Sequence, residues 1–125
     1  MSILNEAADV KAPIAGRVIE MTISTTTAAY LIPESFAGCY CRFKVFADSG
    51  DISAYIAFGA STVNVVAAAL STIGGSGTIT MVGTTGERID SGSVEHWVMP
   101  AITSDTTHFA IDATAAGRLQ IIKTG

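Results

Sequence analysis

Short stretches of alternating apolar and polar residues run along most of this chain, separated by turn-forming residues. A period of two places successive side chains on opposite faces of a β-strand, so each stretch predicts a strand with one buried face. Pro33 and the sequence Asp48-Ser49-Gly50-Asp51 are typical of the breaks between strands. The pattern predicts strands over 18–23, 28–32, 39–46, 52–58, 78–82, 94–98, 108–111 and 119–122.

Residues 63–70 are ambiguous in this pattern. The sequence Ala67-Ala68-Ala69-Leu70 favours a helix, whereas Val63, Val65 and Val66 favour a strand, and we assign a short strand leading into a loop. Eight or nine short strands, with turns about every 8 to 12 residues, are typical of a β-sandwich. We therefore predict an all-β fold, a single jelly-roll-like sandwich of antiparallel strands over residues 17–125.

The alternation also predicts which side chains form the core. Each chosen residue lies at a period-two position on a face that it shares with other apolar residues. The predicted core residues are Phe43, Val45, Ile56, Phe58, Val94, Val98, Phe109 and Ile111.

Residues 1–16 differ from the rest because they show no clean period and end on the breakers Pro13 and Gly16. The segment is too apolar for a solvated tail, since burying one aliphatic side chain is worth about 1.5–3 kcal/mol. We predict an extended N-terminal arm that contacts another subunit or a partner, with the alternative that it folds back on its own domain. The candidate contact residues are Ile3, Leu4, Val10 and Ile14.

The composition agrees with a β fold and adds a prediction of association. The 125 residues fit one domain, and they include 38 β-branched residues but only 4 leucines. Charged residues make up 14%, against about 25% in an average soluble domain, and the mean hydropathy is +0.46. So apolar a surface predicts a homo-oligomer, and we prefer a dimer to a trimer because two-fold association is the commonest closed symmetry.

Net charge and local sequence exclude several partners and compartments. The net charge of −4 and the scattered basic residues argue against direct binding of nucleic acid. The N-terminus lacks the pattern of a secretory signal, and the longest apolar run, 63–73, is too short to cross a membrane. Cys39 and Cys41 would point the same way from one strand, so we predict two free thiols in a reducing cytosol.

Candidate chemistry is sparse, and we predict no catalytic residues, no bound metal and no cofactor. Cys39, Cys41, His96 and His108 are zinc-ligand types, but their spacing is a poor chelate and packing explains them better. The glycine-rich stretch 74–77 matches neither a nucleophile elbow nor a phosphate-binding loop. Most aspartates stand in turn sequences, where they cap the turn.

An ordered set of short sequence segments from Ile52 to the end gives the chain a family resemblance. They are Ala54-Tyr55-Ile56-Ala57-Phe58-Gly59, then Arg88-Ile89-Asp90-Ser91-Gly92-Ser93-Val94-Glu95, then Pro100, Thr107-His108-Phe109-Ala110-Ile111 and Gly117-Arg118-Leu119-Gln120-Ile121-Ile122. In these segments the chain resembles small virion proteins of tailed bacteriophages, of the head-decoration (capsid cement) type. Residues 1–51 carry no part of the resemblance.

The resemblance implies a non-enzymatic structural protein that clamps and stabilises major capsid subunits. The implied partners are the major capsid protein and further copies of the chain, on the outer surface of a virion assembled in the host cytoplasm. An acidic chain suits a surface that should not adhere to packaged DNA. A tail-fibre or receptor-recognition module remains the alternative. A cupin-like enzyme is a third hypothesis, weakened because the sequence lacks a cluster of histidine ligands.

Overall fold

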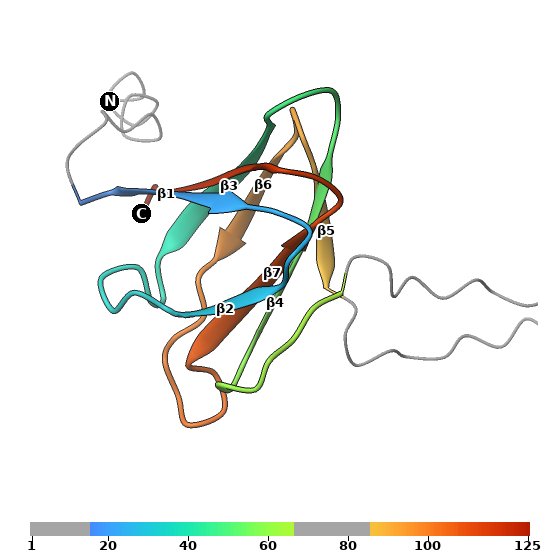
Figure 1. Ribbon diagram of the computed structural model, residues 1–125. Coiled ribbons are helices and arrows are strands. Elements are labelled where there is room, and N and C mark those ends of the chain that lie inside the picture. The colour runs from blue at the N-terminus through green and yellow to red at the C-terminus, as the bar shows by residue number, and fades with distance from the viewer. Residues whose placement is uncertain (1–15, 67–85) are drawn as a thin grey trace, which may run out of the picture.

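The computed structural model describes residues 16–66 and 86–125, and these form a sandwich of two antiparallel four-stranded sheets (Figure 1). The all-β sandwich predicted from the alternation is confirmed. The strands in chain order are β1 (Val18–Ile23), β2 (Ala28–Leu31), β3 (Tyr40–Ala47), β4 (Ser53–Gly59), β5 (Glu87–Asp90), β6 (Val94–Val98), β7 (His108–Ala113) and β8 (Gly117–Lys123).

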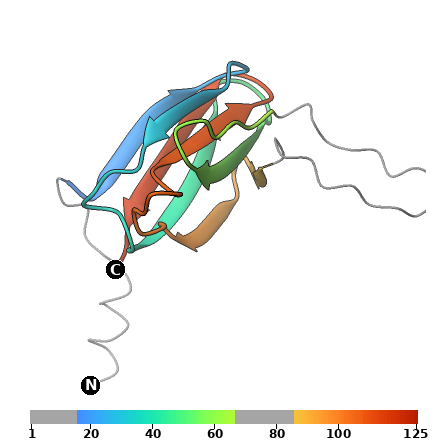
Figure 2. The same cartoon turned by 90° about the horizontal axis from the view of Figure 1, so that it is seen from below.

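The strands pair as nested hairpins. One sheet has the order β1-β8-β3-β6 and the other the order β2-β7-β4-β5. The two sheets pack face to face, and in Figure 2 one layer overlaps the other. The first strand therefore pairs with the last, the second with the seventh, the third with the sixth and the fourth with the fifth. As a result, the end of the chain lies beside the start of β1, where the amide of Lys123 donates to the carbonyl of Arg17.

The core lies between the two sheets and follows the predicted alternation closely in β3. Cys41, Phe43 and Val45 are buried, and their neighbours on the strand are not. Paired strands keep cross-strand partners on the same face, so the partners of Phe43 and Val45 in β8, Ile121 and Leu119, are buried too. From the other sheet, Ile56, Phe109 and Ile111 complete the core. Phe58, predicted as a core residue, is only partly buried at the margin of the core.

The prediction that Val94 and Val98 belong to the core is wrong. In β6, Glu95 lies opposite Phe43 and Trp97 lies opposite Cys41, so Glu95 and Trp97 are on the inner face. The ring of Trp97 packs against Phe43, with centroids 4.9 Å apart. Val94 and Val98 alternate with them and point outwards. A period of two identifies two faces but not which one is buried, and a slip of one residue exchanges them.

This correction predicts a small effect for one substitution. Val98 is 49% exposed, so Val98→Ser should change the free energy of unfolding by about 0.5 kcal/mol or less. Val45→Ser is the matched control, because Val45 is fully buried on β3 and its replacement should cost several times more. Urea unfolding of both variants measures the difference. Equal losses of unfolding free energy at the two positions would contradict the observation that Val98 points outwards from β6.

Two further differences concern the strands themselves. Residues 87–90 form β5, a strand that the sequence pattern did not separate from the turn that follows it. Residues 63–66 form no strand, in contrast to the prediction, while residues 67–70 and the predicted strand 78–82 lie outside the described residues. Of the predicted arm 1–16, only Gly16 is described, and its φ of +86° marks a turn of the backbone just before β1.

Candidate functional site

The two sheets differ in what covers their outer faces. On the sheet β2-β7-β4-β5, Tyr55 and Ala110 point away from the core, yet they are buried in a second cluster with Val65. The segment 60–66 therefore covers part of that face. On the sheet β1-β8-β3-β6, outward side chains are exposed or half-buried on every strand. We call this second surface the open face.

Apolar side chains of the open face are concentrated on the edge strands and at one end of β3. Tyr40 is 67% exposed and lies opposite Val98, so these two side chains are neighbours on adjacent strands. Val94, further along β6, and Val18, on β1, are also exposed. Four of the seven large apolar side chains that are exposed among the described residues belong to the open face. Such clustering is typical of a surface that contacts a partner.

Charged side chains occupy the middle of the open face. Arg118 of β8 forms an ion pair with Glu20 of β1, 2.7 Å apart. Phe46 of β3 lies between two cations, with Lys44 Nζ 5.0 Å and Arg118 Cζ 5.7 Å from the centre of its ring. The contact with Phe46 satisfies Lys44 only in part, since a cation over an aromatic ring keeps its need for hydrogen-bond acceptors.

Arg42 has less compensation than the other cations of the open face. It lies on β3 between His96 of β6 and Ile122 of β8, neither of which carries a carboxylate. Its Nε is buried and has no hydrogen-bond partner in the part of the chain that the structure describes. A buried guanidinium N–H without an acceptor is costly, and none of the salt bridges of the described residues involves Arg42, so its charge has no carboxylate partner there.

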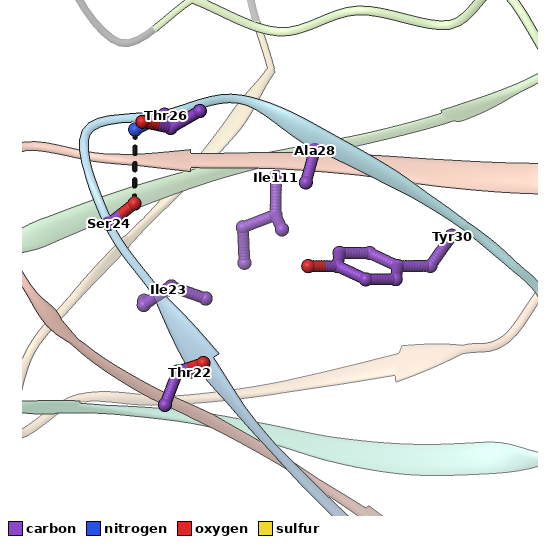
Figure 3. A pocket seen from close by; sticks show the side chains of 7 residues that line it. All are labelled: Thr22, Ile23, Ser24, Thr26, Ala28, Tyr30 and Ile111. Carbon is purple, nitrogen blue, oxygen red and sulfur yellow. Dashed lines mark hydrogen bonds between the residues drawn. The ribbon is translucent and has the colours of Figure 1, made fainter.

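A small cleft opens between the edge strands β1 and β2 (Figure 3). Its volume is about 250 Å³, below the range of about 300–1,000 Å³ of ordinary ligand pockets. Its lining combines hydroxyl-bearing and apolar side chains. It is lined by Thr22, Ile23, Ser24, Thr26, Ala28, Tyr30 and Ile111. The lining contains no Asp, Glu, His, Cys or Lys side chain.

The four residues of ligand type noted in the sequence do not come together. Cys41 points into the core, whereas His96 lies on the opposite face of the same sheet and His108 belongs to the other sheet. The Nδ1 of His108 lies 2.7 Å from the hydroxyl of Thr107. Among the described residues, no group of three or more His, Cys, Asp or Glu side chains is placed to hold a metal ion.

Both thiols are free, and one is chemically protected. Burial, followed by the neighbouring Cys39, raises the pKa of the Cys41 thiol above its ordinary value. We expect two thiols per chain when denatured, non-reduced protein is titrated, and slower labelling of Cys41 than of Cys39 in the native protein. Because the pKa of Cys41 is raised only in the folded protein, its thiol ionises at lower pH in the unfolded chain. The free energy of unfolding should therefore fall as the pH rises above about 8.5. A count of zero thiols, or stability that does not fall there, would contradict this.

A separate polar cluster lies on the other sheet, between β4 and β5. Asp90 accepts hydrogen bonds from Arg88 Nε at 2.7 Å and from the hydroxyl of Ser53 at 2.6 Å. These bonds, that of Arg88 foremost, lower the pKa of Asp90. Arg88 thus has a carboxylate partner within its own strand, in contrast to Arg42 and Lys44.

Comparisons with known proteins add no identification, since no family model, curated protein or solved structure matches this chain. The predicted contact residues Ile3, Leu4, Val10 and Ile14 lie outside the described residues. The described part of the chain contains no helix long and apolar enough to cross a membrane. The sequence alone did not predict the open face, although the alternation of β3 already gave its polar positions.

Proposed function

We propose that this chain is a non-enzymatic structural protein of a phage virion, a decoration protein that clamps and stabilises major capsid subunits. The observation that carries the proposal is the open face, where a whole sheet of a small sandwich presents apolar and cationic side chains to solvent. A protein that works by adhering to a larger assembly needs such a surface and needs no catalytic group.

The fold supports the proposal only in part. The nested pairing of first strand with last and second with seventh is consistent with the predicted jelly-roll arrangement, which occurs in virus capsid domains. A sandwich alone does not define a function, because one architecture serves many. The family resemblance over residues 52–125 and the open face are independent observations that lead to the same proposal.

Self-association belongs to the same proposal. We expect a homo-oligomer, preferably a dimer, in which the N-terminal arm contacts a neighbouring copy or the capsid through Ile3, Leu4, Val10 and Ile14. The uncharged edge strand β2, with Leu31 largely exposed, is a second apolar surface that association would cover. The protein would act on the outer surface of the capsid after synthesis in the host cytoplasm.

A tail-fibre or receptor-recognition module is the second candidate. Exposed Tyr40, beside Val98, favours it, because binding sites for sugars and surface proteins use exposed aromatic rings. The neighbours of Tyr40 in the open face lie on strands rather than at loop tips. This placement suits a broad protein contact better than a sugar-binding site.

Co-sedimentation distinguishes the two candidates. The purified protein is mixed with capsids of the phage that encodes it, prepared without this protein, and separately with host cells. The decoration hypothesis predicts saturable binding to capsids with a fixed copy number and no binding to cells. Binding to cells but not to capsids would replace it by the receptor-recognition hypothesis.

A further inference from the structure

We propose that the open face docks on an acidic protein surface, with Arg42 and Lys44 each receiving a carboxylate from the partner. This inference rests on the proposed function, because it specifies the chemistry that the capsid would present. It depends on the sign and pairing of the charges on the face and on the exposed apolar side chains of the same face.

Charge is unevenly distributed over the molecule. The chain carries a net charge of −4, yet the open face holds three cations, Arg42, Lys44 and Arg118, against the single carboxylate of Glu20. The ion pairs of the described residues are Arg118–Glu20 and Arg88–Asp90, so neither cation of β3 has an ion pair among them. A positive surface on an acidic protein predicts an acidic partner.

The spacing of the two cations sets the geometry of the partner. Arg42 and Lys44 are two residues apart on a strand, so their side chains leave the sheet about 7 Å from each other. Two carboxylates at that separation, for example on alternate positions of one exposed strand, would meet both.

Other occupants fit the face less well. A second copy placed face to face by a two-fold axis would oppose cations of like sign, which is unfavourable. Nucleic acid requires a longer basic stripe, and exposed Tyr40, Val94 and Val98 would stay unburied against a phosphate backbone. An acidic protein surface with apolar side chains of its own covers both kinds of group.

The test uses three probes and three variants. The probes are a glutamate–tyrosine copolymer, which is acidic and partly apolar, duplex DNA, and capsids prepared without this protein. Lys44→Glu and the double variant Arg42→Glu/Lys44→Glu reverse the charge of the open face. Arg88→Glu is the matched control, because Arg88 is an exposed cation on the other sheet. Circular dichroism establishes that each variant is folded, and Lys44→Glu serves alone if the double variant is not.

Wild-type protein should bind the copolymer more weakly as salt rises. Lys44→Glu should weaken binding about 10-fold and the double variant about 100-fold, whereas Arg88→Glu should change it about 3-fold at most. No binding by the wild type, equal losses for all variants, or tighter binding to duplex DNA through the same residues would overturn the inference. Copolymer binding that needs Arg42 and Lys44, without capsid binding, would reject the proposed function alone. Capsid binding that the double variant retains would reject the inference alone.

Discussion

Replacing Phe43 by alanine should lower the free energy of unfolding by about 3–5 kcal/mol, the largest loss that we expect from a single side chain. The ring has no exposed surface and packs against Trp97 from the neighbouring strand. Its removal leaves a cavity between the sheets that the flanking residues of β8, Leu119 and Ile121, cannot fill, because each is itself fully buried.

Phe46→Ala is the matched control for this prediction. Phe46 is on the same strand but faces outwards, where it contacts Lys44 and Arg118 at the surface. Its replacement should cost much less. Urea unfolding followed by tryptophan fluorescence measures both variants, and Trp97 is a local probe of the Phe43 site. A loss below about 1 kcal/mol for Phe43→Ala would mean that this side of the sheet does not form the core.

Deletion of residues 2–14 should abolish assembly while leaving the melting temperature of the sandwich nearly unchanged. The strands and core of the described part are complete without these residues, since β1 begins at Val18 and pairs with β8 over its full length. The four aliphatic side chains of the arm would then act only between subunits. Sedimentation velocity and thermal unfolding measure the two properties separately.

Full-length variants provide the control for the deletion. The quadruple variant Ile3→Ser/Leu4→Ser/Val10→Ser/Ile14→Ser should reproduce the loss of assembly, whereas the double variant Asn5→Ser/Asp9→Ser should not. A deletion variant that unfolds but still binds its partner would show instead that the arm stabilises its own domain.

Strand positions could be predicted from sequence where polar residues mark one face of a strand. In β3, Arg42 and Lys44 identify the outer face, and the inner face was predicted correctly. In β6, both faces carry apolar and polar residues, and only pairing with β3 decides that Trp97 lies inside and Val98 outside. β5 is too short and too polar to show a period of its own. Strand pairing is a long-range property that local alternation does not contain.

The candidate site shows the same limit. The scattered basic residues of the sequence argue against a basic patch, yet the fold brings Arg42, Lys44 and Arg118 onto one face from β3 and β8. The lack of a carboxylate partner for Arg42 follows from its neighbours across the sheet, His96 and Ile122, which are 54 and 80 positions further along the chain. Sequence spacing alone gives no access to such pairings.

The central claim is that this protein stabilises a capsid by clamping its subunits, and the disruption temperature of the capsid tests it most directly. Capsids prepared without the protein are heated alone and with saturating purified protein. Because a ligand that binds only the intact assembly stabilises it by mass action, bound protein should raise the disruption temperature by several degrees, increasing with protein concentration. An unchanged disruption temperature at saturating protein would contradict the claim.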